Sequence, residues 1–266
     1  MASPDAGVRG PTRAQIEDKT LRTDRWWLYP LATFIGFTLF VIYSTWRAFM
    51  ARDFYSSPYL SPFYSPCLAT ACPTEASDFG QPFGDWWKLS PALIILIFPL
   101  GFRFTCYYYR KAYYRSFWLS PPACAVAEPH TAYTGETRFP LILQNIHRYF
   151  WYAAVVVACI LTFDAVLAFR NADHEWGHMG LGTVIMWVNV ALIWLYTLSC
   201  HSCRNIVGGR LRHFSKHPVR YKLWTLVSKV NPYHANYAWA SLISVALTDF
   251  YIYLLANGTI TDLRFF

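Results

Sequence analysis

The sequence predicts an all-α, polytopic membrane protein: a bundle of five transmembrane helices, with the amino terminus in the cytoplasm and the carboxy terminus outside. Two observations lead to this prediction. Hydrophobic residues make up 55% of the 266 residues and gather in long runs, which is too apolar for an ordinary soluble domain. Lysine and arginine are also distributed unevenly over the connections between these runs.

Five runs have the length of roughly 20 residues that a helix needs to cross about 30 Å of hydrocarbon. They cover residues 30–49, 89–108, 149–169, 179–198 and 235–255. Pro99 and Gly101 interrupt the second run, so we expect a kink there. The first run follows a polar tail and has no small-residue cleavage site, so we expect a retained helix and not a signal peptide.

These runs divide the chain into one membrane domain and two tails. We expect a cytoplasmic tail over residues 1–27, the five-helix domain over residues 28–256 and an outer tail over residues 257–266. The connections inside the domain are two basic, aromatic cytoplasmic loops and one outer loop, at residues 109–148, 201–234 and 51–88.

The orientation follows from the positive charges. With the amino terminus inside, 18 of the 23 Lys and Arg residues lie on the cytoplasmic side, as the positive-inside rule requires. The net charge of +8 therefore comes from a belt of Lys and Arg on the cytoplasmic side. This belt could set orientation and contact anionic lipid, or it could dock a soluble partner. Nucleic acid is not expected, because the basic loops contain no recognition motif.

Both inner loops are rich in Tyr, Trp and Phe, so we expect them to pack against something. A surface for a peripheral subunit is the inference. In the outer loop, Cys67 and Cys72 lie close together among prolines, which in an oxidising compartment predicts a disulfide. Cys159 lies in the middle of a run and is expected to be a packing thiol.

The remaining cysteines face the reducing side, where Cys groups more often bind metal. Cys200 and Cys203 would share one face if the fourth helix continues through them, with His201 between them. Four helices would then present ligands at about the same inner depth. The candidate metal ligands are Cys106, Cys124, Cys200, Cys203, His147 and His201, with His234 in reserve.

Three kinds of cofactor could use such ligands. Zinc accepts Cys and His, and an iron–sulfur cluster accepts four Cys, or two Cys and two His as in Rieske-type ligation. Neither a Rieske loop spacing nor a ferredoxin run is present, and unrelated packing thiols stay possible. A two-haem cytochrome is not expected, because the first two runs contain no His. One haem b between His147 and His201 or His234 stays open.

Three segments then resemble a known family. They are FPLGFRFTCYYYRKAYYRSFW, CAVAEPHTAYTGETRFPLILQNIHRYFWY and YTLSCHSCRNIVGGRLRHFSKHPVRY. Together they resemble the membrane anchor subunit of actinobacterial succinate dehydrogenase, or complex II. The resemblance covers nearly the whole chain from Leu21 onward. The resemblance implies a respiratory complex in the bacterial plasma membrane, in which a flavoprotein oxidises succinate and an iron–sulfur protein passes the electrons on. This chain would dock that pair and bind quinone, and the complex could form a higher oligomer.

The better-known anchors of this family carry haem-binding histidines on early helices, and this chain does not. We therefore hypothesise a membrane-embedded, Rieske-like 2Fe–2S cluster held by the candidate ligands, since histidine ligation raises the potential of a cluster. For the quinone, an apolar slot with hydrogen-bond donors is needed. The inner-end residues with that mix are Arg103, Tyr107, His147, Trp151 and Tyr196.

A rival hypothesis is a non-redox membrane scaffold or transporter, in which the inner cysteines bind a structural zinc ion. A transporter of this kind should show a broken-helix repeat across its two halves, and the sequence shows none.

Overall fold

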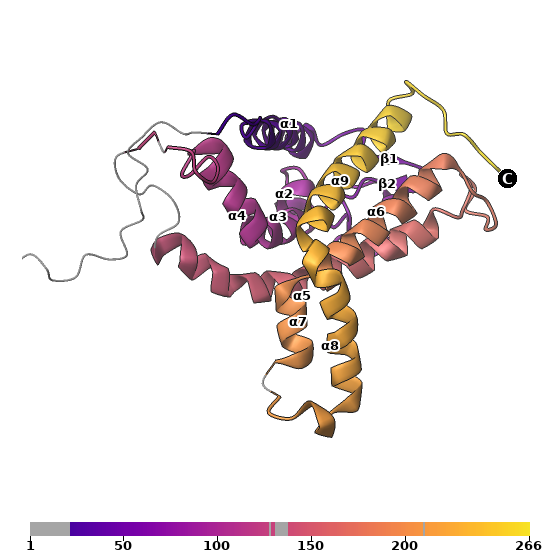
Figure 1. The fold of residues 1–266 in the computed structure, drawn as a ribbon. Helices are drawn as coiled ribbons and strands as arrows, with labels where there is room; N and C mark the ends of the chain where they lie inside the picture. Colours follow the sequence, from indigo (N-terminus) through magenta and orange to yellow (C-terminus); the bar gives the residue numbers. More distant parts are fainter. Residues whose placement is uncertain (1–21, 128, 131–137, 210) are drawn as a thin grey trace, which may run out of the picture.

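The computed structural model describes residues 22–127, 129–130, 138–209 and 211–266, which form a helical bundle with one projecting hairpin (Figure 1). The long helices are α1 (Leu28–Met50), α5 (Arg138–Leu167), α6 (Leu181–Leu198) and α9 (His234–Ala256). The shorter ones are α2 (Ala92–Ile95), α3 (Ile97–Phe104), α4 (Tyr107–Ala112), α7 (His201–Gly208) and α8 (Pro218–Val230). Single turns are η2 (Thr74–Ala76), η3 (Gly84–Trp86), η4 (Tyr113–Phe117), η5 (Phe214–Lys216) and η6 (Asn231–Tyr233). A short antiparallel hairpin pairs β1 (Tyr55–Ser56) with β2 (Tyr59–Leu60).

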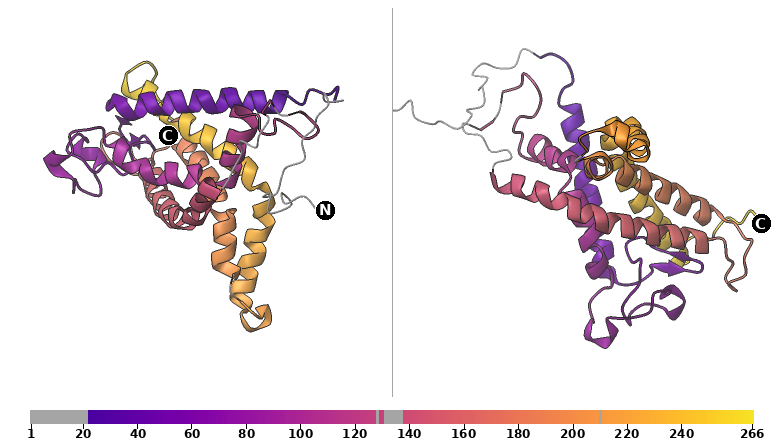
Figure 2. Two further views of the ribbon diagram at one scale, coloured as in Figure 1. Left: turned by 90° about the vertical axis from the view of Figure 1, so that its left-hand side faces the viewer. Right: turned by 90° about the horizontal axis from the view of Figure 1, so that it is seen from below.

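The prediction of a mostly helical protein with several membrane-crossing helices is confirmed. In the described part of the chain, four helices are long and apolar enough to cross a membrane, and a bent pair raises the number to five. The pair joins Ala92–Phe104 to Tyr107–Phe117 at an angle of 72°. Most side chains of α1 are exposed, because this helix lies at the edge of the bundle (Figure 2).

The kink expected near Pro99 and Gly101 takes a different form. The helix breaks at Leu96, so Pro99 falls in the first turn of α3, where its missing N–H costs no helical hydrogen bond. Gly101 permits close packing, since a Cβ atom there would meet the Phe150 ring at 2.1 Å. The larger bend comes later, at Thr105 and Cys106, where the sequence has no Pro or Gly.

The expectation that the fourth helix continues through Cys200 and Cys203 is wrong. Helix α6 ends at Leu198, and Cys200 has an extended backbone (ψ 141°) as the N-cap of α7. Helices α7 and α8 then form an antiparallel hairpin that projects from the bundle (Figure 1). Helix α8 runs through η6 into α9, so Pro218–Ala256 is one helical run of 39 residues.

The connection between α1 and α2 gathers at one end of the bundle, away from the hairpin (Figure 2). It holds the disulfide between Cys67 and Cys72, the pair for which the sequence predicts one. We call this region the disulfide end. Its hydroxyl groups reach carboxylates on different elements: Ser61 donates to Asp249 on α9, and Ser65 donates to Asp164 on α5.

A fully buried ion pair also lies at the disulfide end. The Arg47 Nε atom on α1 donates to the Asp249 Oδ2 atom at 2.8 Å, and both side chains have no exposed surface. Tyr43 donates a further hydrogen bond to the same carboxylate. Because all of these donors converge on Asp249, its negative charge is compensated inside the bundle. Asp164 and Asp249 therefore both serve hydrogen bonds between elements of the fold.

Candidate functional site

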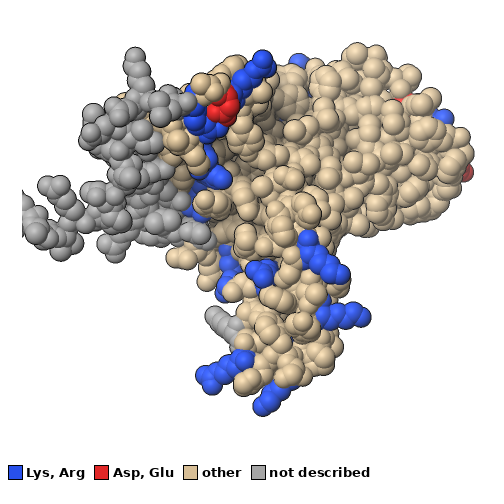
Figure 3. All heavy atoms as spheres, in the orientation of Figure 1, with Lys and Arg blue, Asp and Glu red and all other residues tan. Residues whose placement is uncertain are grey.

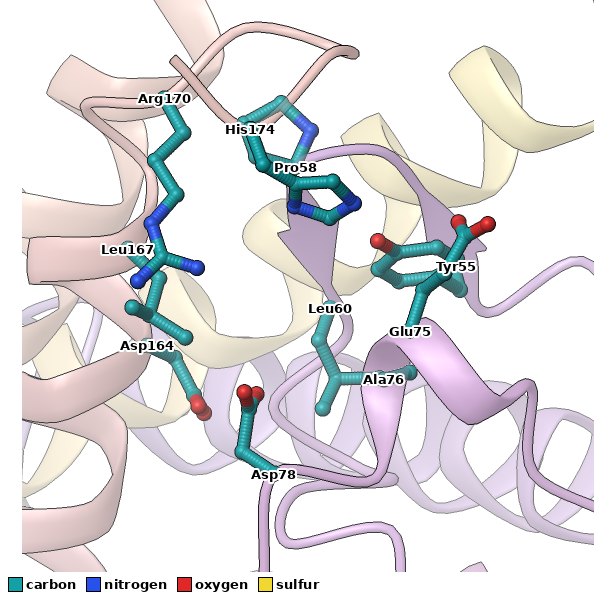
Figure 4. Close-up of a pocket in the computed structure, with 10 residues that line it drawn as sticks. All are labelled: Tyr55, Pro58, Leu60, Glu75, Ala76, Asp78, Asp164, Leu167, Arg170 and His174. Atoms are coloured by element: carbon teal, nitrogen blue, oxygen red, sulfur yellow. The ribbon is translucent and has the colours of Figure 1, made fainter. Parts of the chain in front are cut away.

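Polar groups collect at two places in the bundle. At the disulfide end, a pocket of about 20 Å³ lies between η2, the β hairpin and the end of α5 (Figure 4). Asp78, Asp164, Arg170 and His174 are among the residues that line it. This volume holds about one water molecule, so the pocket is too small for an organic ligand.

The second place is at the opposite end, where four buried or half-buried side chains from different helices meet in two pairs. The His147 Nε2 atom lies 3.2 Å from the Cys200 Sγ atom, and the His234 Nε2 atom lies 3.7 Å from the Cys106 Sγ atom. We call Cys106, His147, Cys200 and His234 the Cys/His layer. Cys106 is the N-cap residue of α4, and Cys200 is the N-cap residue of α7. Both thiols of the layer therefore lie at helix breaks.

Aromatic rings connect the two pairs. The His147 ring stacks on Phe102 with centroids 4.8 Å apart, and the His234 ring stacks on Tyr196 at 5.0 Å. Phe102 and Tyr196 contact each other at 4.9 Å. Phe102 and Tyr196 are fixed in the apolar core, where they are 2% exposed. A single haem between His147 and His234 would have to displace both rings, so this pair of ligands does not fit the packing.

Burial governs the charge state of the thiols and imidazoles near the hairpin. It raises the pKa of Cys200 to about 12, so the thiol stays protonated at neutral pH unless a cation replaces the proton. Burial, together with the positive charge of Arg204, lowers the pKa of His201. The surroundings therefore favour uncharged side chains.

The structure does not bring all the predicted metal ligands together. Cys124 is exposed, and its carbonyl oxygen accepts a hydrogen bond from Arg22. The His201 Nδ1 atom faces Asn231 at 3.4 Å, while Cys203 is buried in the same apolar cluster as Cys106 and Cys200. Within the described ranges, no group of three or more His, Cys, Asp or Glu side chains is arranged to hold a single metal ion.

The predicted quinone residues also separate. Arg103 and Tyr196 line an apolar pocket of about 70 Å³ between α3, α5 and α6, and the Arg103 guanidinium lies 5.0 Å from the Tyr196 ring centre. Trp151 donates its indole N–H to the Thr197 carbonyl oxygen at 2.9 Å, and Tyr107 is 49% exposed. His147 belongs to the Cys/His layer. Only Arg103 and Tyr196 of the five therefore line this pocket.

Arg103 also lines a second, larger space. A groove of about 720 Å³ runs along α1 and is walled by α2, α3, α4 and η4. Its lining is almost entirely apolar, with Arg103 and the Tyr109 hydroxyl among the few polar groups. Arg103 donates hydrogen bonds to Tyr109, to the Ala238 carbonyl oxygen and to Ser241. These contacts fix the guanidinium in the wall of the groove.

Sequence reasoning missed several residues of this end. Tyr109 was one of many tyrosines in an aromatic loop, so nothing marked it out. Thr105 and Ser199, which contact His147 and His234, each directly precede a cysteine of the layer. That repeated hydroxyl–cysteine dipeptide was a signal that could have been found, and it also favours His234 over His201.

The fold and this site define a multi-pass membrane subunit whose buried thiols, imidazoles and aromatic rings are concentrated at one end of the bundle. The comparisons identify which one. The family model described as "Actinobacterial succinate dehydrogenase subunit SdhC" matches residues 28–258, so the chain belongs to that family. No curated protein matches the sequence.

A solved structure agrees with this assignment. The chain is similar to one in "Mycobacterium smegmatis Sdh1 complex in the apo form", with 60% sequence identity and a TM-score of 0.85. The match covers 98% of this chain and 99% of the other. The chain is thus a membrane subunit of a succinate dehydrogenase complex in the bacterial plasma membrane. Its partners are the flavoprotein and iron–sulfur subunits of that complex.

Proposed function

We propose that this subunit docks the iron–sulfur partner at the Cys/His end and passes its electrons to a membrane quinone. The observation that carries the proposal is the convergence of two thiols and two imidazoles from α3–α4, α5, α6–α7 and α9. The Cys/His end would face the cytoplasm, because the basic hairpin α7–α8 extends from it.

The hairpin α7–α8 is the proposed docking arm. Residues 201–230 contain no Asp or Glu. Figure 3 shows Lys and Arg side chains spread over this projection. Arg204 and Arg220 hold the hairpin together through Ser228 and the carbonyl oxygens at the end of α7. Four other cations are exposed: Arg212, Lys216, Lys222 and Lys229.

An apolar stripe accompanies these charges. Val219, Leu223 and Leu226 share one face of α8 by their spacing, and they are 71%, 47% and 51% exposed. The run Pro218–Ala256 would be about 58 Å long at 1.5 Å per residue, nearly twice the hydrocarbon thickness. Helix α8 therefore extends well beyond the lipid, where a soluble partner with an acidic surface can cover the stripe.

The Cys/His layer is the proposed site of an electron carrier. Zinc needs four ligands around one ion, and the described residues offer no such group. A two-iron cluster binds its ligands on two separate metal atoms, so two Cys and two His need not converge on one point. We therefore assign the ligands as Cys106, His147, Cys200 and His234. When bound, such a cluster accepts and releases one electron at a time.

The quinone is proposed to bind where the groove along α1 meets Arg103. The groove can take an apolar tail, while the Arg103 guanidinium supplies a donor for a carbonyl oxygen of the ring. The Tyr109 hydroxyl holds Arg103 in place, because it accepts from Arg103 and donates to the Ala238 carbonyl oxygen. Two electrons and two protons convert the quinone to quinol. Arg103 contacts both Tyr109 and Tyr196, and the Tyr196 ring stacks on His234. The proposed acceptor site therefore lies beside the layer.

Replacing Cys200 by Ser in the intact complex tests the carrier. We expect loss of two iron atoms per complex and loss of succinate:quinone activity, while succinate oxidation with an artificial acceptor persists. Iron per flavin and the electron-paramagnetic spectrum of the reduced complex measure this. Cys159→Ser and Cys124→Ser are the matched controls, since both thiols are exposed and outside the layer. A Cys200→Ser complex with full iron content and full quinone activity contradicts the proposal.

One other function has an observation in its favour. The two Cys–His contacts already act as hydrogen bonds between helices, so the layer could serve packing and docking alone. In that case Cys200→Ser lowers the thermal stability of the complex, the wild-type iron content equals that of the iron–sulfur partner, and quinone activity persists.

A further inference from the structure

A short pattern occurs twice at the Cys/His end, once at each helix break. It consists of an aromatic residue, two further residues, a hydroxyl residue and a cysteine. The first copy is Phe102 to Cys106, at the break between α3 and α4, and the second is Tyr196 to Cys200, at the break between α6 and α7. In both copies the cysteine has an extended backbone, with ψ of 131° and 141°.

Each copy holds one histidine. Phe102 stacks on the His147 ring, and the Thr105 Oγ1 atom lies 2.8 Å from the His147 Nδ1 atom. In the same way Tyr196 stacks on the His234 ring, and the Ser199 Oγ atom lies 2.8 Å from the His234 Nδ1 atom. One ring face and one ring nitrogen of each histidine are therefore fixed by the same five-residue segment.

The cysteine of each copy contacts the histidine that the other copy holds. Cys106 belongs to the segment that holds His147, but its sulfur faces His234. Cys200 belongs to the segment that holds His234, but its sulfur faces His147. The contacts thus cross, and each imidazole lies between a hydroxyl group of one break and a thiol of the other.

The hydroxyl protons have other acceptors. Thr105 donates to the Gly101 carbonyl oxygen at 2.7 Å, and Ser199 donates to the Tyr196 carbonyl oxygen at 3.2 Å. Since a hydroxyl group has one proton, its oxygen is left to accept from the imidazole. Each Nδ1 atom then carries the ring proton, and each Nε2 atom presents its lone pair toward a thiol.

We infer that Thr105 and Ser199 are positioning residues, which hold His147 and His234 in the tautomer and orientation that leave both Nε2 atoms free to bind the electron carrier. The ligand role of Nε2 rests on the proposed function, whereas the tautomer does not. Hydrogen bonds of this kind typically change metal affinity by about 10- to 100-fold when they are removed.

The test uses the intact complex labelled with ¹⁵N-histidine and examined by magic-angle-spinning NMR. His147→Gln and His234→Gln assign the two Nδ1–H signals. Thr105→Val is expected to shift the His147 signal alone, and Ser199→Ala the His234 signal alone. The conservative variants Thr105→Ser and Ser199→Thr are expected to restore the wild-type signals. Thr105→Ala replaces Thr105→Val if the bulkier variant does not assemble.

Thr248→Val is the matched control. Thr248 donates to the carbonyl oxygen four residues earlier, as Thr105 does, but it contacts no histidine. Both histidine signals should stay unchanged in this variant. The inference is overturned if Thr105→Val leaves the His147 signal in place, or if it moves the His234 signal instead.

Chelator challenge of the same variants separates this inference from the proposed function. If both hold, Thr105→Val and Ser199→Ala lose iron at about 10- to 100-fold lower chelator concentration than the wild type. If the wild-type complex has no iron beyond that of its partner, the carrier proposal fails. A shift of the His147 signal alone in Thr105→Val, and of the His234 signal alone in Ser199→Ala, still supports the positioning role.

Discussion

The two ends of the bundle use polar side chains in opposite ways. At the disulfide end, the buried carboxylates of Asp164 and Asp249 both receive hydrogen bonds from the loop, and Arg47 balances the charge of Asp249. At the Cys/His end the buried groups are thiols and imidazoles, and their ring nitrogens and sulfurs face one another. The first arrangement uses the carboxylates for hydrogen bonds within the fold, while the second brings thiols and imidazoles together.

The difference shows that one end of the bundle holds the helices together while the other end carries the candidate functional site. The disulfide end ties α1, α5, α6 and α9 to a single loop through hydrogen bonds, so this end fixes the helices. The opposite end can then carry two helix breaks without losing the fold. Variants at the two ends should therefore change different measurements.

The largest effect is expected from Arg47→Met. This change leaves Asp249 buried without its cation, which typically costs about 3–5 kcal/mol. Thermal unfolding of the purified complex should show a strong loss of stability or a failure to assemble. The double variant Arg47→Met, Asp249→Leu should recover most of the loss, because no charge is left buried. A single variant as stable as the wild type would mean that the pair contributes nothing.

A smaller effect is expected when the disulfide is removed by Cys67→Ser together with Cys72→Ser. The bridge closes a loop with a sequence separation of 5, for which chain entropy gives about 2 kcal/mol. The melting temperature should fall, while iron content and quinone activity per assembled complex stay constant. A change in iron content would show that the two ends are not independent.

The smallest effect is expected from reversing charge on the docking arm. Lys222→Glu with Lys229→Glu should weaken association with the iron–sulfur partner roughly tenfold, or about 1.4 kcal/mol, and the loss should grow as salt is lowered. Co-purification at several ionic strengths measures this. Lys88 is also exposed but lies at the disulfide end, so Lys88→Glu should have no effect. If Lys88→Glu weakens association as much, the arm is not the docking surface.

Much of the fold could be predicted from the sequence, because long apolar runs and the spacing of Cys67 and Cys72 are local signals. The breaks at Thr105 and Ser199 could not, since neither position has a Pro or Gly. There the hydroxyl groups bond back to carbonyl oxygens of the preceding turn and to a histidine from another helix. This is tertiary packing that overrides helical propensity.

For the site, residue type and depth placed three of the four members of the Cys/His layer among the candidate ligands and kept His234 in reserve. The choice of His201 over His234 followed from the assumption of one continuous helix through Cys200 and Cys203. Because α6 ends at Leu198, His201 turns toward Asn231. His234, and not His201, then lies beside Ser199 in the Cys/His layer.

The unbroken run from α8 through η6 into α9 has a mechanical consequence. His234 is the first residue of α9, directly after η6, and α8 at the other end of the same run is the proposed docking surface. A tilt of α8 on assembly would be transmitted along the backbone to the imidazole of His234. If the partner docks on α8 as proposed, assembly of the complex would also set the position of the His234 imidazole.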